Sequence, residues 1–247
     1  ARNQCTATLK EDGYHIDGEK VWILNTKHAD HIVVTTWDKS TEKMIMLLVD
    51  KGTPGMIVGD NIPRMGCNVM YLSSLTFQDC VVPVQRVVSR DAFKTSLRFI
   101  DIPRVFVPAA CIGLAQRALD LTAEYLADRY AFGKSMLENQ WIQFKMAEYT
   151  ASLEAGRWLT YHTATLMDEG DSQASLTAAM NKLYGPELAM EITTACVQWF
   201  GAAGYARNSK VSRLMDAAKM LQIVDGTSEI QRLIIGRKIL KSQSVGK

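Results

Sequence analysis

The first third of the chain has the residue pattern of β-strands. Residues 31–36 and 44–49 are apolar or β-branched runs bounded by Asp, Lys, Ser and Gly, as strands commonly are. Residues 14–18 and 20–24 predict two short strands around a turn, and residues 72–77 predict one more. This segment therefore reads as a sheet.

The turns and the start of this sheet add two expectations. Gly52-Thr-Pro-Gly55 predicts a turn, because proline presets φ and glycine adopts positive φ at little cost. No helical pattern precedes the first predicted strand, so we expect a partial β-barrel or sheet that lacks some partner strands.

From Asp91 onward the apolar residues follow a helical period. Asp91 predicts the N-cap of a helix, and Pro103 and Pro108 within it predict a kink or a short break. The apolar positions that carry this period are Phe93, Leu97, Ile100, Val105, Ala109, Ile112, Ala115 and Leu119.

Further helices follow along the chain. Ser135-Met-Leu-Glu138 fits a capping box, which predicts a second long helix that runs to Gly170. A third helix is expected over about 172–199, and shorter ones over about 209–223 and 228–242. Because long helices with short connections pack against each other in opposite directions, we expect an antiparallel bundle.

The predicted fold class is therefore α+β, with two domains. Residues 1–88 form the partial β-barrel or sheet, and residues 89–247 form an antiparallel bundle of four to five helices.

Composition narrows the functional classes. Apolar residues make up 47% and charged residues 22%, as in ordinary globular proteins. The net charge of +2 argues against nucleic acid or an anionic membrane as a partner, and we expect no run near the roughly 18 apolar residues of a membrane span. The five dispersed cysteines are typical of a reducing compartment, the cytoplasm or a mitochondrial matrix.

Common catalytic motifs are missing from the sequence. The four histidines have no Cys or carboxylate cluster at metal-ligand spacing, so we expect no metal site. There is no nucleophile elbow, phosphate-binding loop or dinucleotide fingerprint. Gly201-Ala-Ala-Gly204 is too short for the last of these and predicts a helix terminus.

Four stretches, met in order and at matching separations, resemble the acyl-CoA dehydrogenase family. They are residues 17–25 (DGEKVWILN), residues 113–119 (GLAQRAL) with Asp101 and Arg104 ahead of them, residues 129–134 (RYAFGK) with Asn139 and Gln140, and residues 198–201 (QWFG) leading to 225–232 (DGTSEIQR). The resemblance covers essentially the whole chain. It implies that the family's N-terminal helical domain and its Thr/Ser-Glu-x-x-x-Gly-Ser segment are absent from this chain.

The resemblance implies FAD as cofactor, bound in extended form between subunits. Arg129 and Gln198 would lie near the pyrophosphate, which the guanidinium fork of arginine matches in geometry. Phe132 and Gln140 would contact FAD largely in the neighbouring subunit. Gly201 and Thr227 complete the implied set. Thr227 can also cap the last helix, whose N-terminal, positive end would then lie near an anion.

Each of these residues has a simpler interpretation. Arg129 could be a solvated cation at a helix end, Gln198 a surface side chain and Thr227 only a helix cap. Trp22, which the resemblance places against the flavin edge, could be a core residue of a strand. Two positions after it the family has Thr or Ser bonded near flavin N5, whereas this chain has Leu24, which cannot form that bond.

The substrate side is also implied by resemblance. Asp101 and Arg104 correspond to positions that meet the CoA moiety. An i,i+3 salt bridge on a helix explains Asp101 equally well, whereas the ligand role is favoured for Arg104. Asp225 stands where most members have the catalytic glutamate, and Gly226 follows it as a substrate-contacting residue. The alternative base position of the family is Pro103 here, so Asp225 is the single inherited candidate; as a simple alternative it is a helix-capping anion.

The implied reaction is FAD-dependent α,β-dehydrogenation of an acyl-CoA, with electrons passed to an electron-transfer flavoprotein. It requires a carboxylate at the α-carbon, hydrogen bonds to the thioester oxygen and a dry pocket. Aspartate is one methylene shorter than glutamate, and a misplacement of about 1 Å can cost roughly 10²-fold in rate.

Three accounts of the shorter residue remain open. The substrate could sit differently, as in relatives that oxidise cyclic or unusual acyl-CoAs; the backbone could move inward; or dehydrogenation could be slow or lost. The last account leaves a reductase, a non-standard oxidase, or a flavin- or acyl-binding subunit of a heteromeric complex. The implied assembly is a homotetramer or a heteromer, in which a separate chain could supply the missing N-terminal part.

Overall fold

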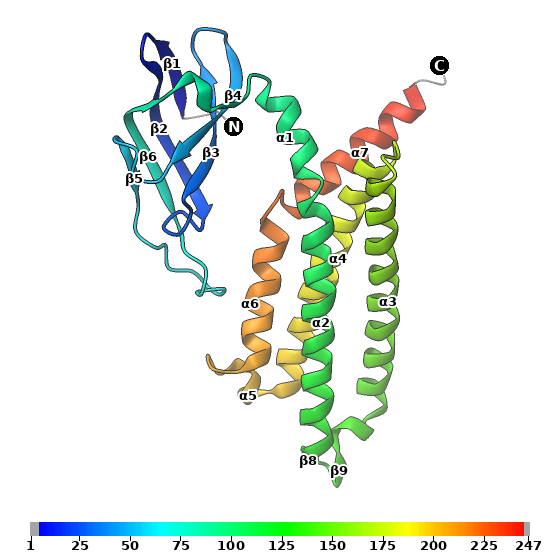
Figure 1. Ribbon diagram of the computed structural model, residues 1–247. Coiled ribbons are helices and arrows are strands. Elements are labelled where there is room, and N and C mark those ends of the chain that lie inside the picture. The colour runs from blue at the N-terminus through cyan, green and yellow to red at the C-terminus, as the bar shows by residue number, and fades with distance from the viewer. Residues whose placement is uncertain (1–4, 245–247) are drawn as a thin grey trace. The chain divides into compact units, whose positions relative to one another are not determined.

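The computed structural model describes residues 5–244, without the side chains at positions 97, 98 and 242–244. Its contacts divide the chain into two compact units, Ala1–Phe99 and Ile100–Lys247. The first unit holds a sheet and the second holds helices (Figure 1). The α+β fold class predicted from the sequence is confirmed.

The first unit is built on an open, mixed, seven-stranded sheet. Only β1 and β3 pair in parallel, and all other neighbours are antiparallel. In spatial order the strands are β5 (Met56–Val58), β6 (Leu72–Val82), β2 (Gly13–Leu24), β1 (Thr6–Lys10), β3 (His31–Asp38), β4 (Lys43–Asp50) and β7 (Val87–Ser89). A 3₁₀ turn, η1 (Val84–Arg86), precedes β7, and α1 (Ala92–Ile100) follows it.

Alternating residues of the strands bury one face of this sheet. Leu75 and Phe77 of β6, for example, are buried, and the exposed Gln78 follows them. The core is made of Cys5, Ala7, Tyr14, Ile16, Val34, Ile45, Leu47, Val49, Leu75, Phe77, Cys80 and Val82.

The prediction of two short strands over 14–24 was wrong. These residues form one strand, β2, whose pairing with β6 shifts register between Ile16 and Gly18 and between Lys20 and Ile23. The polar residues at Gly18-Glu-Lys20 resemble a turn in sequence, but the long partner strand β6 holds them in the ladder.

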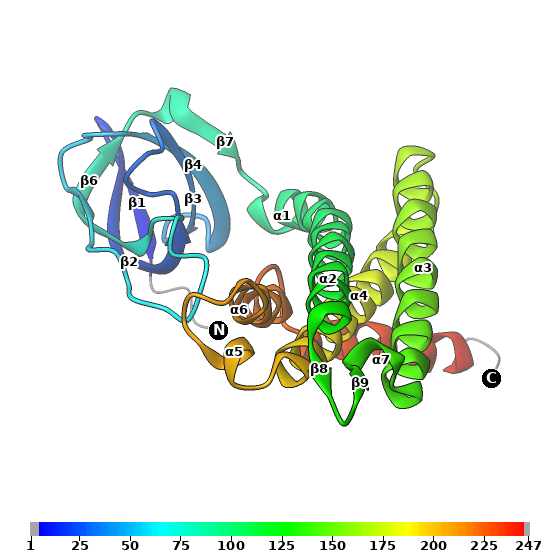
Figure 2. The same ribbon diagram turned by 90° about the horizontal axis from the view of Figure 1, so that it is seen from below.

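The second unit is a helical bundle. Figure 1 shows α2, α3, α4 and α6 running alternately up and down, and both figures show α7 running across them (Figure 2). The helices are α2 (Pro103–Asp128), α3 (Gln140–Asp168), α4 (Ala174–Phe200), α5 (Ala202–Tyr205), α6 (Lys210–Ile223) and α7 (Ser228–Ser244). Their common core is lined mainly by small and aliphatic side chains of α2, α3 and α4.

Both prolines of the first predicted helix have clear effects. The helix breaks at Asp101 and Ile102, so that α1 ends and α2 begins at Pro103, in the first turn where no N–H is needed. Pro108 remains inside α2 but has no N–H to donate to the carbonyl of Arg104. The buried Asn181 of α4 fills that position, with its Nδ2 3.4 Å from the Arg104 oxygen.

The start of the second long helix differs from the prediction. The capping box at Ser135 is present, but it caps a 3₁₀ turn, η2 (Met136–Glu138). Asn139 then caps α3, because its side-chain oxygen accepts a hydrogen bond from the Trp141 N–H at 3.0 Å. A two-stranded hairpin of β8 (Tyr130–Ala131) and β9 (Lys134–Ser135) joins α2 to this turn.

Among the described helices, α2 is long and apolar enough to cross a membrane by length and composition, which the sequence pattern had not led us to expect. Its most apolar window has a mean hydropathy of 1.3 and is 44% buried within the structure. Core helices of bundles have the same composition, so the finding is weak evidence for a membrane span.

A histidine network in the sheet unit gives a testable pH dependence. His15 on β2 contacts Asp79 through Nδ1 at 2.6 Å and Asp12 through Nε2 at 2.8 Å. Hydrogen bonds from Asp12 and Asp79 raise the pKa of His15 above its ordinary 6.5, and His15 lowers the pKa of each aspartate below 3.8. Stability from charged His15 is fully present below pH 6.5 and is lost as pH rises through the raised pKa.

We therefore expect the thermal unfolding midpoint of the sheet unit to fall between about pH 6 and pH 9, and His15→Gln to remove most of that fall. The measurement is circular-dichroism melting over this range. His31→Gln is the matched control, because His31 pairs with Asp50 at an exposed site. An equal pH dependence in His15→Gln and the parent would contradict the prediction.

Candidate functional site

Most of the residues predicted to meet the cofactor gather at one end of the bundle; Thr227 and Trp22 do not. Arg129 follows the last residue of α2, and its Nη1 donates to the hydroxyl of Tyr125, one turn earlier, at 2.7 Å. Tyr125 stacks on Phe200 of α4 with ring centroids 4.1 Å apart, and its hydroxyl lies 3.4 Å from the Phe200 carbonyl. The Arg129 guanidinium is thus held in place while it remains exposed.

The same contacts bring Arg129 close to the end of α4. Gln198 and Gly201 flank Phe200, and the Gly201 N–H donates to the Gln198 carbonyl at 3.0 Å. Gly201 ends α4 with a φ of +63°, a conformation that glycine adopts without strain. The Gln198 side chain is exposed and therefore available to a ligand.

The α2–α3 hairpin adds Phe132 and Gln140 to this end. Phe132 sits at the hairpin tip with a φ of +53° and is 98% exposed. The first turn of α3, which holds Gln140, packs on α4 through an edge-to-face contact of Trp141 with Trp199, at 6.0 Å between centroids. An aromatic ring this exposed at a tight turn is suited to contact something outside the chain.

The predicted base lies in the turn between α6 and α7. Asp225 and Gly226 both have positive φ, +54° and +94°, and reverse the chain within two residues. Thr227 follows at the N-cap position of α7, where its carbonyl accepts from the Gln231 N–H at 3.1 Å and its hydroxyl lies 3.5 Å from the Ile230 N–H. Its predicted capping role therefore holds, through a long hydrogen bond.

Within this chain Asp225 is exposed, and none of the described residues forms a hydrogen bond or ion pair with its carboxylate. Its oxygens are therefore free to accept a proton. The dry pocket expected around the base is not supplied by the described part of the second unit, because the Asp225 side chain is exposed there.

Glu187 of α4 fixes the inner side of the same turn through hydrogen bonds. Its carboxylate accepts from Ser228 Oγ at 2.6 Å, from Gln222 Nε2 at 2.7 Å and from Arg232 Nη2 at 3.1 Å. Gln231, fully buried, donates to the Gly226 carbonyl at 2.9 Å. These bonds fix both flanks of the Asp225 turn without using Asp225.

Asp101 and Arg104 form the i,i+3 ion pair of the simpler interpretation, with Nη1 2.7 Å from the carboxylate. Arg104 is only 7% exposed, and its Nε is buried without a hydrogen-bond partner among the described residues. An unpaired buried guanidinium nitrogen is costly, so a ligand that accepted from it would be favoured. Both interpretations thus remain compatible with the geometry.

The two groups of predicted residues lie at opposite ends of α2. With a rise of about 1.5 Å per residue, the backbones of Arg104 and Arg129 are roughly 37 Å apart. Apart from Thr227, which follows the Asp225 turn, the cofactor residues of the bundle lie together. The substrate residues and Asp225 also lie together, but the structure does not bring the two groups together within one chain.

Trp22 belongs to the sheet unit and is not a core residue. It lies in the second bulge of β2, where Val21 and Trp22 oppose the single residue Ser74 of β6. Trp22 has a φ of +60° and is 65% exposed. A bulge re-aims side chains, and a left-handed non-glycine residue is strained, so both features are typical of a functional position.

Several residues that shape the site were missed in the sequence. Tyr125 stands one helical turn before Arg129, and this i,i+4 spacing was a usable signal. Asn181, Lys182 and Glu187 interrupt the apolar sequence of α4, and all three make contacts outside their own helix. The sequence alone shows that these polar residues interrupt an apolar helix, but it does not show which groups they contact.

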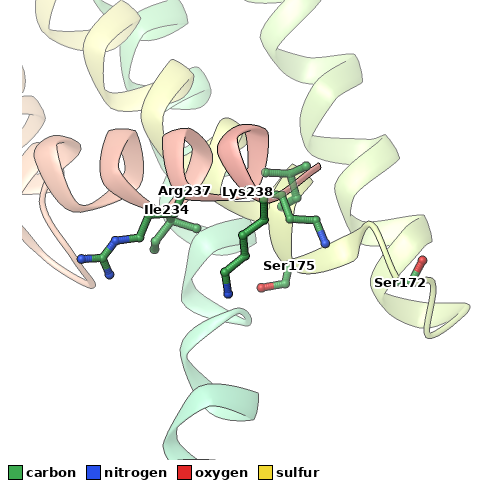
Figure 3. Close-up of a pocket in the computed structure, with 7 residues that line it drawn as sticks. Ser172, Ser175, Ile234, Arg237 and Lys238 are labelled. Atoms are coloured by element: carbon green, nitrogen blue, oxygen red, sulfur yellow. The ribbon is translucent and has the colours of Figure 1, made fainter. Parts of the chain in front are cut away.

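One further hollow lies away from all the predicted residues. It has a volume of about 280 Å³ and is bounded by α7 and the start of α4 (Figure 3). Its lining residues are Ser172, Ser175, Leu176, Ile234, Arg237, Lys238 and Lys241. Over the described part of the chain, no three His, Cys, Asp or Glu side chains are grouped as metal ligands.

Comparison with known proteins decides the family. Residues 1–80 match the model of the acyl-CoA dehydrogenase middle domain, and residues 93–240 match that of the acyl-CoA dehydrogenase C-terminal domain. The chain belongs to the acyl-CoA dehydrogenase family. The resemblance carried by the four sequence stretches is thereby confirmed.

Relatives of this family member include the cyclohex-1-ene-1-carbonyl-CoA dehydrogenases of Geobacter metallireducens and Syntrophus aciditrophicus. They are 36% and 35% identical to the chain, over 95% of its length in both cases and over 63% and 58% of their own. The short-chain specific acyl-CoA dehydrogenase of Clostridium acetobutylicum is 32% identical over 96% of the chain and 64% of its own length. The chain thus spans about three fifths of the length of these relatives.

Solved structures agree with this assignment. Butyryl-CoA dehydrogenase from Megasphaera elsdenii aligns with a TM-score of 0.91 at 34% identity, covering 96% of this chain and 63% of that one. A chain from a study of the electron transferring flavoprotein of Acidaminococcus fermentans aligns with a TM-score of 0.91 at 36% identity, covering 97% of this chain and 64% of that one.

The Glu187 contacts predict a stability effect. Burial acts to raise the pKa of Glu187, but the hydrogen bonds from Ser228 and Arg232 outweigh it and lower the pKa below 4.5. Its stabilisation is present above pH 4.5 and is lost as pH falls through the lowered pKa. Because the carboxylate is partly exposed, we expect Glu187→Ala to reduce the free energy of unfolding at pH 7 by roughly 1 kcal/mol.

Denaturant titration at pH 7 and at about pH 3 measures this effect. The loss should shrink at the lower pH, where the parent also loses the contacts. Glu154→Ala removes an exposed helical pair with Arg157 and serves as control. Equal stability of Glu187→Ala and Glu154→Ala at pH 7 would contradict the prediction.

Proposed function

We propose that this chain is the middle and C-terminal part of an FAD-dependent acyl-CoA dehydrogenase, with Asp225 as the catalytic base. The proposal is carried by the α6–α7 turn, in a chain that belongs to this family. The carboxylate of Asp225, which has no partner among the described residues, projects there from a rigid, left-handed turn just before the N-terminus of α7. A base must be positioned and must have a free lone pair, and Asp225 meets both requirements.

The residues at the other end of the bundle fit FAD. The Arg129 guanidinium is exposed and oriented by Tyr125, as a pyrophosphate contact requires. Phe132 offers an exposed aromatic face, and Gln140 and Gln198 offer exposed amides. When bound, the flavin ring would supply the acceptor for a hydride from the β-carbon of the substrate.

The chain's own residues then have distinct tasks. Asp225 would remove the α-proton of the thioester, while Arg104 and Asp101 would hold the CoA moiety and Gly226 would line the path of the acyl group. Thr227, at the positive end of α7, would favour an anionic group of the cofactor beside it. Trp22 would cover the flavin edge, with Leu24 leaving the N5 region without a hydroxyl donor.

The separation of roughly 37 Å along α2 supports assembly from more than one copy. One subunit would provide the Arg129 end of the FAD site and its neighbour the Asp225 end, in a homotetramer or a related heteromer. An electron-transfer flavoprotein would then accept the electrons, which accords with the solved structure from the Acidaminococcus study. The site of action would be the cytoplasm or a mitochondrial matrix.

A second candidate concerns the substrate. Two relatives at 36% and 35% identity are named for a cyclic thioester, cyclohex-1-ene-1-carbonyl-CoA. That thioester already has its α,β double bond and no α-proton, so the α,β-dehydrogenation proposed here would act on the saturated ring thioester, cyclohexane-1-carbonyl-CoA. A shorter base suits a substrate whose α-carbon approaches the turn more closely than that of a straight chain. We therefore propose cyclic acyl-CoAs as the alternative to short straight-chain ones.

The test uses the flavin-loaded protein that contains this chain. Adding butyryl-CoA or cyclohexane-1-carbonyl-CoA anaerobically should bleach the flavin absorbance, and Asp225→Asn should retain flavin while slowing bleaching by roughly 10²–10⁴-fold. Asp120→Asn is the control, because Asp120 is an exposed residue of α2 that accepts only from Gln116. Undiminished bleaching in Asp225→Asn would remove Asp225 as the base; no bleaching of the parent by either thioester would sink the dehydrogenase proposal.

The FAD site gives a separate prediction. Tyr125→Phe keeps the stack on Phe200 but removes the hydroxyl that orients Arg129. Losing this bond costs about 1 kcal/mol, so the dissociation constant for FAD should rise roughly fivefold. Fluorescence titration of the apoprotein with FAD measures it.

Tyr161→Phe provides the matched control, since Tyr161 is exposed on α3 and contacts only Trp158 among aromatic rings. An unchanged dissociation constant in Tyr125→Phe would mean that Arg129 needs no orienting hydroxyl to bind the cofactor, or that it does not bind the cofactor.

A further inference from the structure

Lys182 of α4 is a buried cation that the proposed reaction does not yet use. Its side chain is 0% exposed, which is rare for lysine. No carboxylate oxygen lies within the 4.0 Å ion-pair distance of its Nζ in the described part of the chain. Its one hydrogen bond goes to the backbone carbonyl of Leu221, at 2.9 Å.

The Leu221 carbonyl needs that donor because of where α6 ends. In a continuing helix it would accept from the N–H of residue 225, but α6 stops at Ile223 and Asp225 adopts a left-handed φ of +54°. The preceding carbonyl, of Met220, still receives the Val224 N–H at 3.1 Å. Lys182 therefore replaces the amide of Asp225 as the donor to the first carbonyl that the helix end leaves unpaired.

The neighbouring Asn181 does the same for α2, where Pro108 leaves the Arg104 carbonyl without a helical donor. Two consecutive residues of α4 thus each satisfy an unpaired backbone carbonyl. Asn181 donates to that of Arg104, the predicted CoA contact, and Lys182 donates to that of Leu221, in the last turn before the predicted base. Thr160 of α3 donates to Asn181 Oδ1 at 3.0 Å and fixes the amide in the orientation that this requires.

The charges around Lys182 point to Asp225 as its counter-ion. Burial lowers the pKa of Lys182, and Arg104 of α2 lowers it further, whereas Cys111 of α2, Asp225 of the α6–α7 turn and Glu187 of α4 raise it. Burial raises the pKa of the Cys111 thiol to about 12, so Cys111 is uncharged near neutral pH. Glu187 is already engaged by Ser228, Gln222 and Arg232. Asp225 is the anion that remains.

We propose that Lys182 is a positioning residue for Asp225. By donating to the Leu221 carbonyl it ends α6, and by ending α6 it turns Asp225 out of the helix. The proposal rests on the function proposed above, in which Asp225 is the base.

The first test separates position from charge in the flavin-loaded protein. Lys182→Met removes both donor and charge, Lys182→Gln keeps a donor without charge, and Lys182→Arg keeps both. Lys219→Met is the matched control, because Lys219 is an exposed lysine of α6 that bonds Gln222. Flavin content and circular dichroism verify that each variant is folded.

We expect Lys182→Met to lower the limiting rate of flavin reduction by roughly 100-fold, as a misplaced base should, with acyl-CoA and FAD affinity within threefold of the parent. Lys182→Gln, which keeps a donor, should be slowed less than Lys182→Met. Lys182→Arg should restore the rate to near that of the parent. Should Lys182→Met not fold, the rates of the Gln and Arg variants decide.

A second measurement does not depend on activity. Without Lys182 the Leu221 carbonyl is free to accept the Asp225 N–H, so in Lys182→Met the amide exchange of residue 225 should slow by tenfold or more. Parent-like exchange at residue 225 together with a parent-like rate of flavin reduction in Lys182→Met would overturn the proposal. Failure of the parent itself to bleach would instead overturn the proposed function, whereas bleaching by the parent with no effect at Lys182 overturns only this inference.

Discussion

The close contact of α2 with α4 is the constraint on which the second unit depends. It occurs where Gly185 lies against Pro108: a Cβ at position 185 would come within 2.9 Å of the Pro108 Cβ and 3.0 Å of its Cα. Interiors are packed too densely to absorb such an overlap, so a larger residue would force the helices apart. The separation of the two helices sets whether Asn181 reaches the Arg104 carbonyl.

Several features follow from that approach. The proline at the contact also removes a backbone donor from α2, and Asn181 supplies the missing hydrogen bond from the facing helix. The same helix carries Glu187, which holds the start of α7, and ends with Phe200, which stacks on the Tyr125 that orients Arg129. One helix therefore positions the residues proposed for substrate and base at one end and those proposed for the cofactor at the other.

The two carboxylates near the α6–α7 turn differ in whether protein groups use their hydrogen-bonding capacity. Glu187 is saturated by three donors and acts as a structural anchor. Asp225, in contrast, has no protein partner among the described residues and stands on strained backbone. A left-handed backbone at a residue other than glycine costs stability, and such a cost is typical of functional positions.

Much of the architecture could be predicted from the chain alone. The period of the apolar residues indicated the long helices, and Pro103 indicated the break that separates α1 from α2, because these signals act over a few residues. The ordered motifs around Trp22, Arg129 and Asp225 indicated the family, and the i,i+3 spacing indicated the Asp101–Arg104 pair. All of these depend on local geometry, which a sequence specifies directly.

Other features were decided by the tertiary structure. The joining of residues 13–24 into one bulged strand depends on the register of β6, and the exposure of Trp22 depends on the bulge so formed. Lys182 reads in sequence as a lysine within an apolar helix, and only the packing of α4 on α6 determines that its ammonium reaches the Leu221 carbonyl. The helical period of the sequence determines which side chains lie on the same face of a helix. The way in which two helices pack determines which unpaired backbone group such a side chain meets.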